Sequence, residues 1–567
     1  MGATATHSLG RTDTGTNRWL LYFFPSLTDF AFIWPILVLF VVLPGSSVLL
    51  YDGDTGWHIR TGEWIWQHKA VPTTDLFSFT KPHEPWFAWE WGWDLLFAGI
   101  HHFWGLAGVT FASVVILCTI SALLFRLIRR YSDRDTLALA FTALAITGSS
   151  IHWLARPHLI SWLFILIFAH VLLSAEKGYI KALLWLPALT VLWVNLHGAF
   201  FVGILMLLTS AAGETLSVLF SAEPFWQTAW MRTRWYMTCA FACSVATFIN
   251  PYTWKLHWHV LHYVRDSRLL DSIMEFQSAN FHQVRFLPFE CALVLGVGGA
   301  FWCAGRRQFS AALSVLLWAH WSLLCARNIP IFLLISAPFT ACMTRELLVK
   351  ISITGRFQRA SLSAAEASRE FRSLDRLPRL YLASLTALIV VGLGFVWKKP
   401  GFKAQFDSRV FPTTALPFIK SAKLSRLFTT DQWADYLIYY LYPAQQTYVD
   451  GRSDMFGADF VQRCKNIMSA QHNWEENLRA DGVNAVMLSP DVPVVSALKK
   501  SKNWKLLFDN GSVVIFQAVS MTQSPKESVV KPVQISLAVS GGRKELGRLS
   551  PSAPFHLNLE SQERKSS

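Results

Sequence analysis

Residues 51–60 read YDGDTGWHIR, a polar, doubly acidic run that follows directly on the apolar segment 29–50. An apolar segment of about twenty residues is long enough to cross the hydrocarbon core of a bilayer as a helix. If segment 29–50 does so, Asp52 and Asp54 both emerge at one boundary between water and lipid. Ionisable groups at such a boundary are well placed to act on a substrate held in the membrane, so this run is the first candidate site.

The composition of the chain is that of a membrane protein. Its 567 residues are 52% hydrophobic and only 16% charged, and they include 26 Trp and 42 Phe, whereas soluble domains hold about 25% charged residues. The formal net charge of +14 raises nucleic acid as a partner, but the basic residues cluster in short loops between apolar runs. That distribution indicates membrane topology, so we expect contact with membrane lipid and no nucleic-acid partner.

Apolar segments recur along the chain and predict about eleven transmembrane helices, since each is close to the length of about twenty residues that a span requires. They lie at 29–50, 105–125, 135–153, 159–174, 182–195, 198–219, 235–249, 287–304, 309–325, 329–344 and 380–397. One set of the loops between them is strongly basic, which predicts a cytoplasmic location for these loops and for residues 1–28. The basic residues are Arg126, Arg129, Arg130, Arg134, Lys177, Lys181, Arg232, Arg234, Arg306 and Arg307, with more in 345–379.

The loops on the opposite side hold nearly all of the unusual polar clusters. They are the first outer loop at 51–104, RPH at 156–158, NLHG at 195–198, NPYTW at 250–254, the loop 255–286 and RNIP at 327–330. The alternation of the spans therefore gathers the candidate functional residues on one face of the membrane. We expect this to be the periplasmic face of a bacterial inner membrane, with residues 29–400 forming the transmembrane domain.

Residues 401–519 are polar enough to form a separate domain on the same outer face. Short apolar runs at 427–430, 446–449, 484–488 and 512–516 predict strands, and the segments 431–442, 457–481 and 492–501 predict helices. This alternation predicts a small α/β domain. Residues 520–567, which are rich in Ser, Pro, Lys and Glu without periodicity, are expected to be a disordered tail.

Asp52 and Asp54 lie two residues apart, so in an extended segment their side chains point to the same side. Such a pair is suited to hold a divalent cation such as Mg²⁺ or Mn²⁺, or to work as a general base and the group that orients it. The plain alternative is that both carboxylates end the helix and are solvated at the interface. An aromatic belt accounts for the tryptophans of the loop, but it leaves the interleaved Asp, His, Arg and Glu residues unexplained.

Three stretches of the first outer loop, DGDTGWHIRTG at 52–62, VPTTDLFS at 71–78 and WFAWEW at 86–91, resemble bacterial multi-pass proteins related to the GT-C glycosyltransferases. The looser similarities are RPH at 156–158, NLHG at 195–198, NP at 250–251, RNIP at 327–330 and VDGRSD at 449–454. GT-C enzymes use a polyprenyl-phosphate-linked sugar as donor. The resemblance therefore implies an α-helical polytopic enzyme that carries out an inverting sugar transfer to an acceptor that the sequence leaves unidentified.

The resemblance also implies roles for particular residues. It assigns the catalytic base to Asp52 or Asp54, and the other carboxylate becomes its partner or, with it, a metal ligand. Glu90 is the candidate for a second acid–base group. Because the departing lipid phosphate needs cations and donors to stabilise its charge, the candidate substrate-binding residues are His58, Arg60, Arg156, His158, Asn195, His197 and Arg327.

Two other functions stay open. A transporter or flippase for a lipid-linked saccharide would use the same arginines without needing the acidic pair, but it should place ionisable residues at mid-membrane, where the predicted spans have almost none. A non-catalytic membrane assembly protein would use the outer domain for partners. Trp433-Ala434-Asp435-Tyr436 resembles only faintly the acceptor motif of oligosaccharyltransferases, so we infer no transfer to asparagine.

Two further motifs have plain structural interpretations. His257, His259 and His262 do not share one face of a helix, so an interfacial helix is favoured over a transition-metal site. Asp450-Gly451-Arg452 reads as a turn with a local ion pair after a strand.

Overall fold

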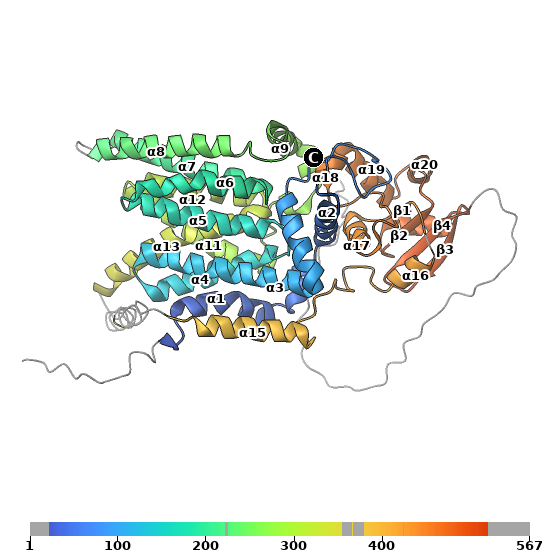
Figure 1. Ribbon diagram of the computed structural model, residues 1–567, viewed down its shortest axis with the longest axis horizontal. Helices are drawn as coiled ribbons and strands as arrows, with labels where there is room; N and C mark the ends of the chain where they lie inside the picture. Colours follow the sequence, from blue (N-terminus) through green and yellow to red (C-terminus); the bar gives the residue numbers. More distant parts are fainter. Residues whose placement is uncertain (1–21, 221–224, 354–365, 367–378, 423, 520–567) are drawn as a thin grey trace, which may run out of the picture.

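The computed structural model describes residues 22–220, 225–353, 366, 379–422 and 424–519. Long helices run side by side in one bundle, and the C-terminal segment lies at one end of it (Figure 1). The bundle helices are α1 (Leu27–Leu37), α3 (Trp91–Ser132), α4 (Asp135–Ser149), α5 (His158–Glu176), α6 (Leu186–Val194), α7 (Phe201–Phe220), α8 (Phe225–Ala246), α11 (Leu287–Gly305), α12 (Phe309–Leu324), α13 (Ile329–Ile353) and α15 (Leu382–Val396).

The bundle accounts for the predicted apolar segments, because a helix overlaps each of them. Five helical segments of the described chain are long and apolar enough to cross a membrane: Trp91–Ser132, His158–Glu176, Gly198–Phe220, Val284–Gly305 and Ala326–Ile351. The shorter apolar helices are Leu27–Val42, Ile180–Val194, Phe309–Leu324 and Leu382–Val396. The chain is thus a mostly helical membrane protein, while the number of about eleven spans and their orientation remain predictions.

The first outer loop is largely helical. Asp54 begins α2 (Asp54–His68), and α3 starts at Trp91, well before the predicted span. Within α3, Gly105 has φ +59, a conformation that residues with a side chain rarely adopt. This residue divides α3 into a short first arm outside the predicted span and a long second arm within it, so the predicted loop becomes two packed helices.

The C-terminal segment contains a four-stranded mixed sheet in the order β1-β2-β4-β3. Its strands are β1 (Leu427–Phe428), β2 (Ala485–Leu488), β3 (Trp504–Asp509) and β4 (Val514–Ala518). β1 pairs with β2 in parallel, and the other pairings are antiparallel. The helices around the sheet are α16 (Leu416–Ala422), α17 (Asp431–Leu441), α18 (Ser453–Phe456), α19 (Ala458–Met468), α20 (Trp474–Ala480) and α21 (Pro493–Lys500).

The predicted strand at 446–449 is not a strand of this sheet. Thr447 forms only isolated bridges, one to Leu427 and one to Ser78 of the first outer loop. The backbone of Thr447 therefore pairs with the C-terminal segment on one side and with the first outer loop on the other. β3 was missed, and it is an edge strand in which most side chains are at least partly exposed, so it lacks the apolar alternation of a half-buried strand.

A buried arginine joins the first outer loop to the C-terminal segment. Arg452 contacts Asp75 and Asp450, each at 2.6 Å, and its guanidinium lies over the rings of Phe77 and Trp86 at 4.8 and 4.6 Å. The predicted pair within 450–452 is present, but it is part of a larger buried cluster, because Asp75 comes from the distant first loop. The division of the chain into domains at residue 400 stays a prediction, as does the tail at 520–567, which lies outside the described residues.

Candidate functional site

Arg156 joins the two carboxylates of the acidic run. Its Nη1 lies 2.7 Å from Oδ2 of Asp52, and its Nη2 lies 2.6 Å from Oδ2 of Asp54. The backbone around it is held by neighbouring segments, since the N–H of Ala155 donates to the carbonyl of Leu49 at 2.8 Å. The side chains of Asp52, Asp54 and Arg156 are 14%, 6% and 12% exposed. One guanidinium thus sets the orientation of both carboxylates in a largely buried place.

The acidic run is not extended as the spacing argument assumed. Oδ1 of Asp52 accepts a hydrogen bond from the N–H of Asp54 at 2.9 Å, which turns the chain into α2. A carboxylate at the start of a helix also interacts favourably with the helix dipole. Both side chains nevertheless reach the same partner, because Arg156 presents a different nitrogen to each of them.

A third carboxylate, from Glu275, lies between two arginines. Its Oε1 is 3.3 Å from Arg156 and 3.9 Å from Arg327, and its Oε2 is 3.4 Å from Nε2 of His152. Burial acts to raise the pKa of Glu275, but the guanidinium groups of Arg327 and Arg156 outweigh it and hold this pKa below its usual range. Glu275 is therefore ionised at neutral pH and fixes the spacing of the two cations.

Glu90 lies between two histidines at the start of α3. Its Oε2 is 3.5 Å from His58, and its Oε1 is 3.4 Å from His197. Burial raises the pKa of Glu90 to about 7, although Arg156 and Arg327 act in the opposite direction. Burial also holds the pKa of His58 and of His197 well below the usual range. The group thus combines neutral imidazoles with a carboxyl that can exchange a proton near neutral pH.

The histidines of this group are oriented by buried partners. Nδ1 of His58 lies 2.6 Å from Oδ1 of Asp94, and Nδ1 of His197 lies 2.7 Å from the hydroxyl of Ser161. Each imidazole therefore has one nitrogen engaged within the protein and turns the other toward Glu90. Such fixed orientation is what a proton-transfer group requires.

α17 of the C-terminal segment brings Asp435 close to Asp54. A Cβ atom on Gly451 would clash with Oδ1 of Asp54 and would lie 2.8 Å from Oδ2 of Asp435, and the N–H of Gly451 donates to Oδ1 of Asp435 at 3.0 Å. Burial raises the pKa of Asp54 to about 8 despite the opposing charge of Arg156, and burial together with Asp54 raises that of Asp435. Two adjacent buried carboxyls do not both ionise readily, so they hold a proton between them near neutral pH.

Three of the candidate substrate-binding residues make other contacts. Nε of Arg60 donates to the carbonyl of Tyr439 at 2.8 Å, and its Nη1 pairs with Glu63 at 2.5 Å. The side-chain oxygen of Asn195 accepts a hydrogen bond from the indole N–H of Trp91 at 2.8 Å and so links the end of α6 to the start of α3. The imidazole of His158 lies 2.9 Å from the carbonyl of His152. Arg60 and Asn195 thus hold helices together, whereas His158 supports His152 beside Glu275.

The expected metal ion does not fit this arrangement. Asp52 and Asp54 meet at the guanidinium of Arg156, which occupies the place that a divalent cation between them would need. Within the described ranges, no group of three or more His, Cys, Asp and Glu side chains is arranged to hold a metal ion. We therefore derive no catalytic step through Mg²⁺ or Mn²⁺.

Sequence reasoning missed two carboxylates of the site, Glu275 and Asp435. It also missed the supporting residues Asp94, His152 and Ser161. Glu275 lies in the outer loop 255–286, where it is an isolated acidic residue without a motif. Asp435 belongs to the WADY sequence at 433–436, which resembles an acceptor motif faintly and contains nothing that relates it to the acidic pair. Neither the loop position of Glu275 nor the WADY sequence identifies a contact partner more than one hundred residues away along the chain.

No family model matches this sequence, and no curated protein matches it. Among solved structures, the apo oligosaccharyltransferase of Archaeoglobus fulgidus has a TM-score of 0.50 and 11% identity, covering 90% of this chain and 75% of its own. ArnT from Cupriavidus metallidurans bound to undecaprenyl phosphate has a TM-score of 0.46 and 15% identity. The match covers 87% of this chain and 99% of the ArnT chain. The archaeal oligosaccharyltransferase AglB from Archaeoglobus fulgidus, in complex with an inhibitory peptide and a dolichol-phosphate, has a TM-score of 0.47 and 10% identity. The match covers 88% of this chain and 74% of the AglB chain.

Apolar helices with a buried polar site at one end define a polytopic membrane protein. The likeness to the apo oligosaccharyltransferase shows the fold, and this fold is GT-C-like. The predicted GT-C-like architecture is confirmed at that level. At 11% identity the likeness shows the fold alone, so activity and substrates are matters for the proposal that follows.

Proposed function

We propose that this protein is an inverting membrane glycosyltransferase that transfers a sugar from a polyprenyl-phosphate-linked donor to an acceptor on the periplasmic face of the bacterial inner membrane. The observation that carries the proposal is the buried contact of Asp52 and Asp54 with a single guanidinium, that of Arg156, at one end of the helical bundle. This contact supports the proposal, because a carboxylate that can act as a base lies beside a guanidinium that can bind phosphate. The GT-C-like fold supports the same class of reaction.

The chemistry requires a base and a leaving-group site. One carboxylate, Asp52 or Asp54, removes the proton of the acceptor's nucleophilic atom while that atom bonds to C1 of the sugar. The bond between C1 and the phosphate oxygen breaks, and its electron pair leaves with the lipid phosphate. Attack from the face opposite the phosphate inverts C1. Arg156 and Arg327 then stabilise the charge on the departing phosphate.

Glu90 has a supporting place in this scheme. Its pKa of about 7 lets it take up a proton from the base, or hold the acceptor by a hydrogen bond, near neutral pH. His58 and His197 flank it on both oxygens and keep its orientation fixed. We assign Glu90 to acid–base work and both histidines to substrate or proton positioning.

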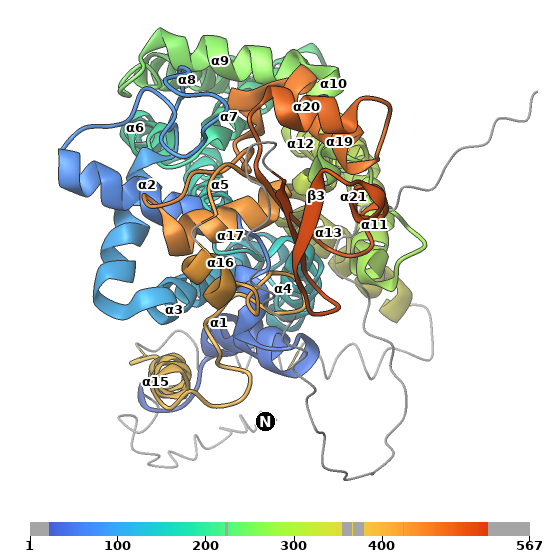
Figure 2. The ribbon, with the colours of Figure 1, turned by 90° about the vertical axis from the view of Figure 1, so that its right-hand side faces the viewer.

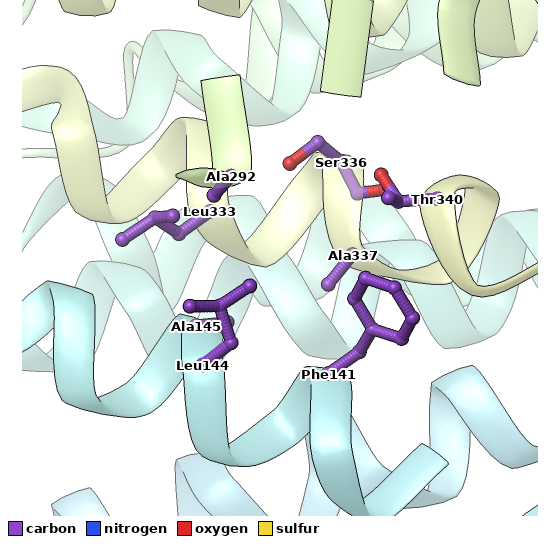
Figure 3. A pocket seen from close by; sticks show the side chains of 8 residues that line it. All are labelled: Phe141, Leu144, Ala145, Ala292, Leu333, Ser336, Ala337 and Thr340. Carbon is purple, nitrogen blue, oxygen red and sulfur yellow. The ribbon is translucent and has the colours of Figure 1, made fainter. Parts of the chain in front are cut away.

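The position of the ionisable cluster supports this proposal over a transporter. A cavity between α4, α11 and α13 has a volume of about 10 Å³ and is lined mainly by apolar side chains (Figure 3). A space of that size holds roughly one water molecule and is far smaller than a saccharide. The ionisable cluster lies instead at the end of the bundle, where a lipid-linked donor would present its phosphate.

The test is transfer of radiolabelled sugar from a panel of polyprenyl-phosphate donors by the purified full-length protein. We expect Asp52→Asn or Asp54→Asn to lower the rate by about 10²-fold or more, the usual cost of losing a general base. The matched control is Asp459→Asn, because the side chain of Asp459 is 88% exposed in a surface pair with Arg268. Equal rates in all variants would reject the acidic site, and no transfer from any donor would favour the transporter or assembly functions.

A further inference from the structure

A second cavity lies beside the site, between the outer loop 255–286 and the C-terminal segment. It has a volume of about 340 Å³ and is lined by His259, His262, Tyr263, Arg265, Asp266, Leu269, Asp454 and Gly457. The first six residues belong to α9 (Trp254–Arg265), to α10 (Ser267–Leu270) and to the residue between them, and the last two belong to α18 and its end. Figure 2 shows α9 along one edge of this end of the molecule, near α19 and α20. A cavity of this size accommodates a small organic ligand.

An aromatic wall connects the cavity with the acidic cluster. The ring of Trp89 contacts the rings of His259 at 5.2 Å and Tyr263 at 5.9 Å, and Glu90 is the next residue in the chain. On the other side, Tyr263 contacts Phe276 at 6.0 Å, and the guanidinium of Arg327 lies over Phe276 at 5.4 Å. The ring contacts therefore run from the cavity through Trp89 to the residue next to Glu90, and through Tyr263 and Phe276 to Arg327.

Three polar side chains of the cavity, those of His259, Asp454 and Asp266, are held by neighbouring groups. Nε2 of His259 lies 2.9 Å from Oδ2 of Asp454, and these side chains are 17% and 12% exposed. The ring of His259 stacks on Phe87 at 4.5 Å. Asp266 is held because its Oδ1 accepts from the N–H of Leu269 at 3.1 Å. The lining therefore offers the ordered His259–Asp454 pair and the ordered carboxylate of Asp266, and it also includes the exposed side chains of His262 and Arg265.

The charges of the lining disfavour a phosphate ligand. Two carboxylates, of Asp266 and Asp454, face one guanidinium, of Arg265. A phosphate would meet more negative than positive charge in this lining. Hydroxyl groups both donate and accept hydrogen bonds, so they match a mixed set of carboxylates, imidazoles and a guanidinium, and the aromatic rings match the apolar face of a sugar ring.

We propose that this cavity binds the acceptor, and that the acceptor is a hydroxyl-bearing saccharide. The proposal rests on the transferase function proposed above and names the substrate class of that site. The donor phosphate is placed at Arg156 and Arg327, and the acceptor approaches from the C-terminal side past Trp89. The His259–Asp454 pair holds acceptor hydroxyl groups and directs one of them toward Glu90 and the acidic pair.

The test measures binding without turnover. Saturation-transfer NMR is recorded on the full-length protein in lipid nanodiscs that contain no sugar detergent, with methyl glycosides of glucose, mannose, galactose, arabinose, rhamnose and N-acetylglucosamine as probes. We expect saturation of at least one glycoside. Asp454→Leu and Arg265→Gln should each weaken that binding by about fivefold or more, the loss expected for one hydrogen bond to a charged group.

One control variant and several contrary results complete the test. Asp459→Asn changes a neighbouring surface carboxylate outside the cavity lining and should leave glycoside binding unchanged. Asp454→Asn keeps the shape of the side chain and tests the pair if Asp454→Leu fails to fold. Three results would overturn the saccharide site. They are no saturation of any glycoside, saturation in both cavity variants equal to that of the wild type, and displacement of the glycoside by inorganic phosphate. Glycoside binding without transfer from any donor would reject the transferase and leave the cavity assignment standing.

Discussion

The carboxylate of Glu275 determines how two arginines can share one small volume. Arg156 and Arg327 both approach its Oε1, at 3.3 and 3.9 Å. Without a negative charge between them, two guanidinium groups in a largely buried place would repel each other. Glu275 therefore keeps both cations in position. In the proposed reaction these cations bind the donor phosphate, and Glu275 does not need to touch the substrate.

Glu275→Gln removes this charge while keeping the side-chain shape. We expect the free energy of unfolding to fall by about 3 kcal/mol at pH 7, because breaking a buried ion pair leaves its partners uncompensated. The pKa of Glu275 is lowered in the folded protein, so its contribution is present above the ordinary glutamate range and is lost as pH falls through the folded value. Denaturant unfolding in micelles at pH 7 and at acidic pH checks both points. A variant as stable as the wild type at pH 7 would contradict them.

Glu90 predicts the opposite pH dependence. Burial raises its pKa from 4.5 to about 7, so the folded protein holds the proton more tightly than the unfolded chain does. The stability that this proton provides is complete below about pH 4.5 and is lost as pH rises through 7. Wild type should thus lose about 3 kcal/mol relative to Glu90→Gln across this interval. Unfolding curves of both proteins at several pH values test this prediction. It would be refuted if the unfolding free energies of the two proteins changed with pH in the same way.

The sequence indicated most of these residues but not their partners. The first-loop motif identified Asp52, Asp54, His58 and Glu90, and short motifs elsewhere identified Arg156, His197 and Arg327. Several of the contacts that join them, such as those of Arg156 with Asp52 and of Glu90 with His197, link segments more than one hundred residues apart, and local spacing contains no information about such pairs. Arg60 shows the reverse problem, since it lies within the motif yet donates to Tyr439 of α17.

At the scale of elements, α2 and α17 approach closely because glycines lie between them. A Cβ atom on Gly53 would lie 2.5 Å from the carbonyl oxygen of Gln432, and one on Gly56 would lie 2.6 Å from that of Asp435 and 2.9 Å from Cβ of Tyr439. Such contact distances exclude any side chain. The glycines of the acidic run thus allow α17 to bring Asp435 to Asp54.

Gly56→Leu should separate these two helices. The added side chain overlaps backbone atoms of α17, so we expect a loss of about 1–3 kcal/mol in unfolding free energy and a fall in sugar transfer, because Asp435 moves away from Asp54. Gly392→Ala is the matched control, since its Cβ would meet only a ring carbon of Phe111 at an ordinary 3.8 Å. Thermal unfolding and the transfer assay compare the two. Equal behaviour of both variants would contradict close packing of α2 on α17.

Helices were easier to predict than the sheet for a physical reason. Each apolar window is a local property, so α4, α5 and α12 were expected close to their observed bounds. The strand β3 is stabilised by pairing with β4 rather than by its own alternation, and the segment 446–449 is held by contacts with Ser78 and Leu427. Pairings of this kind depend on the tertiary fold and leave little trace in a short stretch of sequence.

At the scale of the whole molecule, the bundle and the C-terminal segment are joined by a continuous core. One hydrophobic cluster includes Trp93 and Phe97 of α3 together with Phe406, Tyr436 and Leu437 near the sheet. α2 and α17 lie between the bundle and the sheet (Figure 1), and they contain Asp54 and Asp435 of the candidate site. The composition predicted both parts, but their junction depends on contacts such as that between Arg452 and Asp75, which are visible only in three dimensions.

Arg452 is therefore the residue whose change tests the junction. Arg452→Met keeps much of the volume between Phe77 and Trp86 but leaves Asp75 and Asp450 without their cation. We expect a loss of about 3–5 kcal/mol, because both carboxylates stay buried and unpaired, and faster proteolysis between the bundle and the sheet. Adding Asp75→Asn and Asp450→Asn to this variant should restore part of the stability, since neutral amides cost less to bury. If Arg452→Met unfolded like the wild type, the C-terminal segment would be held to the bundle by the shared apolar core alone, and Asp435 would reach Asp54 without help from the buried arginine.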